Sequence, residues 1–203
     1  VAGFYAFSAS GEQAPARPQI SYSTTEVTSG TLSGTTPVQG TLNYANARDL
    51  VSGVSGTVTG LPAAGTQISA GQQLYAVDNK PVFLMRGALP GWREFIEEMP
   101  NGPDITQLEE NLKALGFFSR GPDEKFDWYT QEAILRWQKD RGLERTGSIE
   151  LGRIEFSPTD VRVAEVKAHL GDHISSGAAM LGLSDLNRQV TVNLKLSDQR
   201  LGT

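Results

Sequence analysis

Residues 65–74 read GTQISAGQQL, and residues 171–180 read GDHISSGAAM. Both segments follow the pattern G-x-x-I-S-x-G-x-x-[LM], which makes them copies of one repeat. The two glycines of each copy permit tight turns with positive φ, and the isoleucine and the last apolar residue point into one core. One copy alone has too little apolar surface to fold. We therefore expect the copies to pack into one small β-sandwich, and everything between them to be an insertion.

Alternating apolar and hydroxyl-bearing residues predict further strands outside the repeat. They lie at residues 20–22, 26–33, 38–44, 153–156, 161–166 and 188–196. The last of these strands has no obvious partner except the region 20–59, and the pattern stops at Thr203. We interpret the strands before residue 50 and after residue 186 as parts of a truncated β-barrel, and those at 153–156 and 161–166 as part of the β-sandwich.

The insertion carries the pattern of two helices. In the first, an apolar stripe is made by Ile105, Leu108, Leu112 and Leu115. Asp104 and Gln107 predict a capping box at its start, and Gly116 predicts its end. Glu109 and Glu110 fall opposite the stripe, so we expect both carboxylates to be solvated.

The second helix is predicted to begin at Thr130 as N-cap and to end at Gly142. Ala133, Ile134 and Trp137 form its buried stripe. The following turn, residues 146–148, is expected to cap a short third helical turn. Trp92, after Pro90 and Gly91, is expected to pack at the joint between the insertion and the β-domain.

These patterns predict a multi-domain protein of β plus α class. Residues 1–19 are expected to form a linker, and the apolar residues 1–7 at its start are either the end of a membrane anchor or a disordered terminus. Residues 20–50 and 186–203 supply the strands of the partial barrel, next to the membrane. Residues 51–90 and 154–185 are the two halves of the β-sandwich. Residues 91–153 are the inserted helical domain.

Composition excludes several classes of function. The formal net charge is −5, and Lys and Arg are scattered, so the basic stripe of a nucleic-acid-binding protein is missing. The absence of cysteine excludes disulfides and thiolate chemistry. His169 and His173 flank a turn and have no further ligands nearby in sequence, so we expect no metal site. We find no catalytic motif and expect no enzyme activity and no cofactor; Lys80 is read as a turn residue.

The insertion resembles the peptidoglycan-binding domain of many bacterial wall enzymes. The matching residues are Asp104-Ile105, Leu108, Leu112, Leu115-Gly116-Phe117, Phe126, Thr130, Ala133-Ile134, Trp137-Gln138, Gly142-Leu143 and Thr146-Gly147. One departure is Asp127, which stands where the family has a second loop glycine. The resemblance implies contact with peptidoglycan.

We take Trp128, Tyr129, Asp127 and Gln138 as the candidate peptidoglycan-binding residues. The two aromatic rings precede the second helix, where they can stack on sugar faces. The alternative is that one ring covers the small core of the insertion. Trp137 falls on the apolar stripe and is assigned to that core.

The surrounding repeat resembles the lipoyl-like half-motifs of membrane fusion proteins of the haemolysin-D type. Residues 31–32, 40–42, 56–57, 80–84 and 89–90 look like the actinobacterial members of that group. In that family the halves flank an α-helical hairpin, and here the peptidoglycan-binding-type domain takes its place.

That resemblance implies an extracytoplasmic adaptor, anchored to the cytoplasmic membrane and facing the wall, whose partner is the permease and ATPase of an ABC transporter. A homo-oligomer is compatible with this role. Two alternatives stay open: the wall-targeting module of a peptidoglycan hydrolase, and a purely structural part whose helical domain has lost its ligand.

Overall fold

The computed structural model describes residues 26, 29–30 and 39–192. The chain divides into a unit of residues 1–37 and a unit of residues 38–203, and every element named below belongs to the second. The predicted linker over 1–19 and the predicted strands over 20–22 and 26–33 lie wholly or largely outside the described residues. No helix in the described part is long and apolar enough to cross a membrane.

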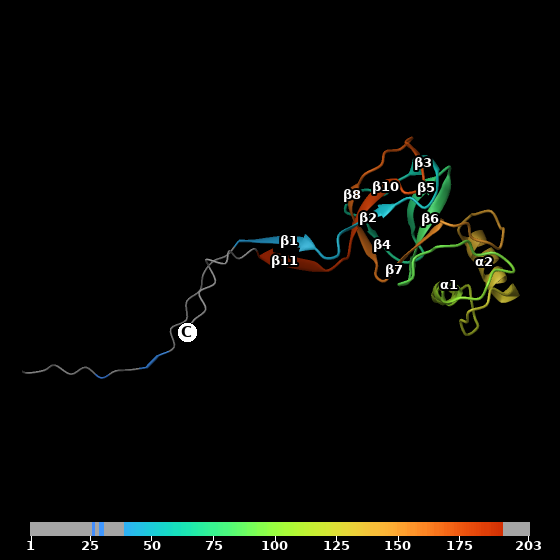
Figure 1. Ribbon diagram of the computed structural model, residues 1–203, viewed down its shortest axis with the longest axis horizontal. Coiled ribbons are helices and arrows are strands. Elements are labelled where there is room, and N and C mark those ends of the chain that lie inside the picture. The colour runs from blue at the N-terminus through green and yellow to red at the C-terminus, as the bar shows by residue number, and fades with distance from the viewer. Residues whose placement is uncertain (1–25, 27–28, 31–38, 193–203) are drawn as a thin grey trace, which may run out of the picture. The chain divides into compact units, whose positions relative to one another are not determined.

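Most strands of the described part belong to two sheets (Figure 1). The first sheet has the order β2 (Arg48–Val51), β10 (Ala179–Ser184), β8 (Val161–Val166), β4 (Gln67–Ile68). The second has the order β7 (Ile154–Ser157), β6 (Lys80–Arg86), β5 (Gln73–Val77), β3 (Gly56–Gly60), β9 (His173–Ile174). Only β6 and β7 pair in parallel within these sheets.

The two repeat copies exchange strands. The short strand β4 of the first copy pairs with β8, and the short strand β9 of the second copy pairs with β3. The turns match as well: the amide of Gly65 donates to the carbonyl of Val163 at 2.7 Å, and the amide of Gly171 donates to that of Val58 at 2.8 Å. Each half therefore completes the sheet of the other, and neither half forms its sheet alone.

The expected common core is confirmed. Ile68 is 2% exposed and lies in one apolar cluster with residues of both sheets, and Ile174 packs against the same cluster. The turns need glycine, because Gly65 and Gly171 have φ of +91° and +90°. Residues 51–90 and 154–185 thus meet in a single folded unit.

A separate two-stranded ribbon is formed by β1 (Gly40–Tyr44) and β11 (Arg188–Val192), which lie side by side in Figure 1. Leu42 and Val190 are paired across it and are 60% and 65% exposed. The ribbon falls where the partial barrel is predicted. The other strands of that barrel fall outside the described residues, so the barrel stays a prediction.

Both predicted helices are present, but both starts were misassigned. α1 (Pro103–Ala114) has Gly102 as its N-cap, with no side-chain capping bond. Asp104 does not cap α1, because Arg93 binds both of its carboxylate oxygens at 2.6 Å. α2 (Trp128–Asp140) is capped by Asp127, and Thr130 is the third helical residue, which completes the capping box instead of opening the helix.

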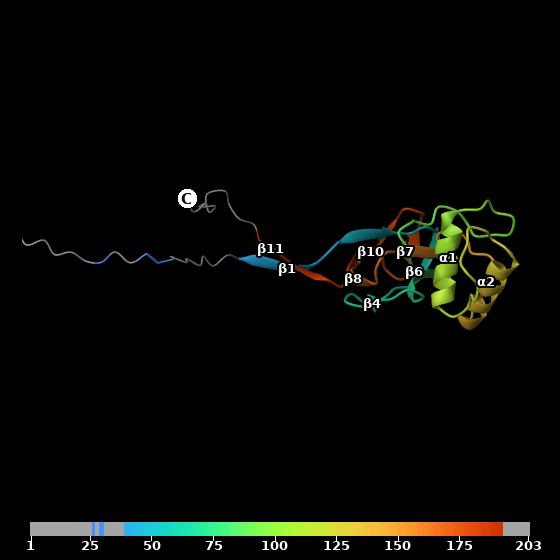
Figure 2. The ribbon, with the colours of Figure 1, turned by 90° about the horizontal axis from the view of Figure 1, so that it is seen from below.

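The expected apolar stripes are confirmed, and they pack against the β-domain. Strand β6 alternates between two cores: Val82 and Leu84 face the sandwich, while Phe83 and Met85 face the helices. The helix core also takes residues of β7, and in Figure 2 α1 lies beside these two strands, with α2 on its far side. The insertion is therefore packed on the sheet through a shared apolar core.

Two buried amides of α1 add to this attachment. Asn111 accepts from the backbone amide of Arg86 and donates to the carbonyl of the same residue, both at 2.6 Å. One turn earlier, Gln107 bonds the amide and the carbonyl of Leu89 at 3.1 and 2.9 Å. These side chains of α1 thus take the place of a neighbouring strand at Arg86, the last residue of β6, and at Leu89 beyond it.

Asn111→Ala is expected to lower the free energy of unfolding by about 1–3 kcal/mol, because it leaves the amide and carbonyl of Arg86 without side-chain partners. Urea denaturation measures the change. Glu110→Ala, on the exposed face of the same helix, is the control and should change stability by less than about 0.5 kcal/mol. Equal effects of the two variants would contradict a role for the amide in docking.

Two expectations about the insertion were wrong. No third helical turn follows residues 146–148; instead Ile149 forms an antiparallel bridge with Phe95, with both backbone bonds at 2.9 Å. Trp92 does not fill the joint, because it is 50% exposed and lies beside the guanidinium of Arg93. Phe83 and Met85 of β6 occupy the joint in its place, which explains why the tryptophan is not needed there.

Candidate functional site

The start of α2 carries an exposed aromatic pair. Trp128 is 63% exposed and Tyr129 is 42% exposed, so neither ring covers the core of the insertion. The two rings meet edge to face with their centroids 5.1 Å apart. The guanidinium of Arg120 lies 4.0 Å from the centroid of Tyr129. The result is a surface of two rings and a cation, in which Trp128 is the more exposed of the two aromatic residues.

Asp127 fixes the position of this pair. Its carboxylate accepts hydrogen bonds from the amides of Tyr129 at 2.7 Å and Thr130 at 3.2 Å. The side chain is therefore committed to capping α2, and its place in the candidate site is that of a support for the rings.

A buried carboxylate holds the first turn of α2, which carries the aromatic pair. Glu109 of α1 is 1% exposed, which contradicts the expectation of a solvated side chain. It accepts from the amide of Asp123 at 2.8 Å and from the hydroxyl of Thr130. Burial raises the pKa of Glu109 above its ordinary value. This side chain joins α1, the loop after it and the first turn of α2.

Gln138 lies apart from the aromatic pair. It is ten residues further along α2 than Trp128, which corresponds to about 15 Å of helix. Its amide donates to Thr146 and Ser148 and accepts from the amides of Thr146 and Gly147, all within 2.8–3.0 Å. These four bonds use its whole hydrogen-bonding capacity, so Gln138 holds the loop after α2. The structure brings together three of the four candidates and separates this one.

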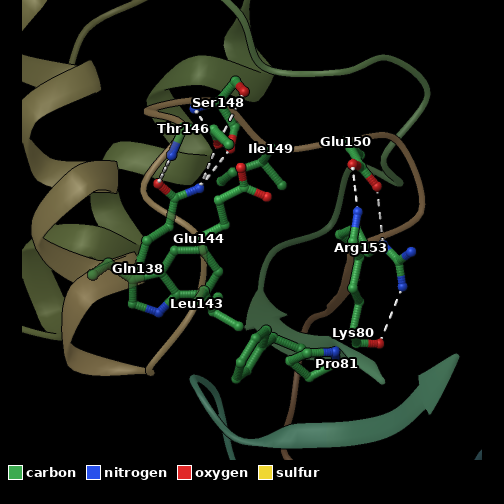
Figure 3. Close-up of a pocket in the computed structure, with 12 residues that line it drawn as sticks. Lys80, Pro81, Gln138, Leu143, Glu144, Thr146, Ser148, Ile149, Glu150 and Arg153 are labelled. Carbon is green, nitrogen blue, oxygen red and sulfur yellow. Dashed lines mark hydrogen bonds and ion pairs between the residues drawn. The ribbon is translucent and has the colours of Figure 1, made fainter. Parts of the chain in front are cut away.

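A pocket of about 110 Å³ lies at the junction of the helices and the sheet, and no sequence pattern indicated it. Figure 3 shows its lining. The residues are Lys80, Pro81, Phe83, Trp137, Gln138, Leu143, Glu144, Thr146, Ser148, Ile149, Glu150 and Arg153. They come from strand β6, from the end of α2 and from the chain that returns to β7. A pattern search cannot find such a site, because its walls are distant in sequence.

An ion-pair network lies along one side of the pocket (Figure 3). Glu150 accepts from Lys80 at 3.3 Å and from Arg153 at 3.2 Å. These bonds, chiefly the one from Arg153, lower the pKa of Glu150 below its ordinary value. Arg153 also donates to the backbone carbonyls of Val77 and Lys80, so it serves the fold as well as the pocket.

Comparison with known proteins locates the family resemblance in the insertion. No curated protein matches the chain. A solved structure from Bacteroides eggerthii DSM 20697, named a "Putative efflux transporter", aligns at 16% identity and a TM-score of 0.31 over 72% of this chain and 42% of that one. The chain spans less than half of that protein, and so weak a likeness carries no argument. Residues 101–150 match the family "Putative peptidoglycan binding domain", so the chain carries a domain of this type between the halves of its β-domain.

Proposed function

We propose that the chain is a non-catalytic extracytoplasmic adaptor of an export complex and that its inserted domain contacts peptidoglycan. The observation that carries the proposal is the placement of the peptidoglycan-binding-type domain, residues 101–150, inside a β-domain whose halves complete each other. A domain that only tethers a protein to the wall needs one flexible connection. This one has two connections and a shared core, which suits a part that fixes position.

The shared core gives the proposal a mechanism. Phe83 and Met85 of β6 pack among the apolar residues of α1 and α2. When the rings of Trp128 and Tyr129 bind a glycan strand, the orientation of the β-domain is therefore set relative to the wall. In the proposed complex, the split domain is lipoyl-like, the ribbon of β1 and β11 leads into a membrane-proximal barrel, and an N-terminal anchor and an ABC transporter hold the assembly at the membrane.

Retention on purified peptidoglycan tests the binding part of this proposal. Trp128→Ala combined with Tyr129→Ala should weaken retention roughly ten-fold, because two aromatic contacts of about 0.5–1.5 kcal/mol each are lost. A co-sedimentation titration measures the affinity. Trp128 is 63% exposed and Tyr129 is 42% exposed, so the fold should survive the change.

Trp92→Ala is the matched control, since Trp92 is also an exposed tryptophan but precedes the matched residues 101–150. It should leave retention unchanged. Failure of the unmodified chain to sediment with peptidoglycan would contradict the proposed binding, and an equal loss in the control would remove the aromatic pair as its site.

A further inference from the structure

The pocket at the junction is built by two domains. Lys80, Pro81, Phe83 and Arg153 lie outside residues 101–150, the part that matches the peptidoglycan-binding family. The remaining walls come from the end of α2 and the loop after it. The pocket is therefore a property of the combined structure, and the aromatic pair at the other end of α2 takes no part in it.

Its size limits what it can hold. A cavity of about 150 Å³ just accepts benzene, so a pocket of about 110 Å³ is too small for a sugar ring. It suits a methyl-sized side chain with a few backbone atoms. The base is apolar: Phe83 and Trp137 meet edge to face at 5.1 Å, and Pro81, Leu143 and Ile149 line it too.

The charges at the rim are arranged for a ligand that carries both signs. Lys80 and Arg153 lie on one side of the pocket, while the carboxylate of Glu144 lies on the other (Figure 3). The side chain of Lys80 is 57% exposed, and its 3.3 Å pair with Glu150 is of the exposed kind that contributes little. Lys80 can therefore turn to a ligand carboxylate at low cost. Glu144 forms no ion pair within the described part of the chain.

We propose that this pocket binds the carboxyl end of a short peptide with small apolar side chains, such as the alanyl end of a peptidoglycan stem peptide. The terminal carboxylate of the peptide binds Lys80, and its methyl groups contact Phe83 and Trp137. An amine nearer the amino end of the peptide approaches Glu144. The choice of stem peptide rests on the proposed wall contact. The inserted domain would then bind two parts of the wall: sugars at the start of α2 and a stem peptide at its end.

Nuclear magnetic resonance on the full chain, with D-alanyl-D-alanine as the probe, tests this inference. The indole nitrogen of Trp137 is buried without a hydrogen-bond partner in the described residues, so its resonance should report occupation of the pocket. Trp92→Phe and Trp128→Phe variants assign the three indole signals. The dipeptide should shift the Trp137 signal saturably, whereas chitotriose, which has the sugars and no peptide, should leave it in place.

Lys80→Glu should weaken the dipeptide affinity at least five-fold, and Lys80→Arg should keep it. Lys113→Glu, an equal charge change at an exposed position of α1, is the control and should have no effect. Absence of a dipeptide-induced shift, or equal losses in Lys80→Glu and Lys113→Glu, overturns the inference.

The pocket and the proposed wall contact fail in different ways. Retention on peptidoglycan without a shift of Trp137 overturns the peptide pocket and leaves the wall contact standing. A shift of Trp137 without retention overturns both the wall contact and the assignment of the pocket to stem peptides.

Discussion

Phe83→Ala should lower the free energy of unfolding by about 3–5 kcal/mol, which is the usual loss for a buried phenylalanine. Phe83 is 6% exposed and belongs to the helix core, although its strand β6 is part of the sheet. Its ring packs edge to face with Trp137 of α2. The substitution therefore opens a cavity where the two domains meet, and both should lose stability.

Chemical denaturation followed by two signals measures this coupling. Tryptophan fluorescence reports the unfolding of the insertion. Trp128 and Trp137 lie in α2, and Trp92 lies in the segment that leads from β6 to α1. Far-ultraviolet circular dichroism reports the whole chain. In the unmodified chain and in Phe83→Ala the two transitions should coincide, with the midpoint lower in the variant.

Leu170→Ala is the control, since Leu170 is 67% exposed at a turn of the β-domain and should cost less than about 0.5 kcal/mol. A fluorescence transition that moves while the dichroism transition stays in place would mean that the insertion unfolds independently. That result would contradict the coupling through the shared core on which the proposed positioning role depends.

The sandwich was predictable because its signal is local and repeated. A glycine that must adopt positive φ, followed at fixed spacing by an inward isoleucine, can be recognised without knowing the partner strand. The exchange of β4 and β9 was not predictable in detail, because two-residue strands leave no periodicity to detect. The apolar stripes of α1 and α2 were predictable for the same reason as the repeat: three or four residues at helical spacing define one face.

The polar residues of α1 were not predictable. Gln107, Glu109 and Asn111 look like a solvated helix face, but their partners lie at the end of β6 and just after it, in the loop after α1 and at the start of α2. The start of α1 was misread because Arg93 takes the carboxylate of Asp104. Such partners are distant in sequence, so only the folded chain reveals them. The same is true of the pocket. The sequence also left open whether Trp128 or Tyr129 covers the core of the insertion, and only the folded chain shows that both rings are exposed.

Glu109→Ala should cost about 2–4 kcal/mol. It removes the acceptor for the amide of Asp123 and for the hydroxyl of Thr130, which is 0% exposed, and it leaves a cavity beneath the loop. The rings of Trp128 and Tyr129 stand on the helix turn that Glu109 braces, so the variant should also weaken retention on peptidoglycan. Thermal denaturation and co-sedimentation measure the two effects.

Glu109→Gln removes the ionisable group of Glu109 but keeps nearly the same side-chain size. The amide oxygen can still accept from Asp123, and the amide nitrogen can donate to the oxygen of Thr130, so most of the bracing should persist. Because burial raises the pKa of Glu109 above its ordinary value of 4.5, the folded chain binds the proton more tightly than the unfolded chain does. The contribution of this group to stability is therefore complete below pH 4.5 and declines as the pH rises through the raised pKa of the folded state.

The stability of the unmodified chain minus that of Glu109→Gln, measured by urea denaturation at a series of pH values, isolates this titration from those of Glu150 and Asp185, whose pKa values are lowered. The difference should favour the unmodified chain most at low pH and fall as the pH rises above 4.5 towards neutrality. A difference that is constant with pH would show that Glu109 ionises equally easily in both states. The carboxylate would then be hydrated in the folded chain, and the loop that carries Asp123 would not be closed over α1 as the structure has it.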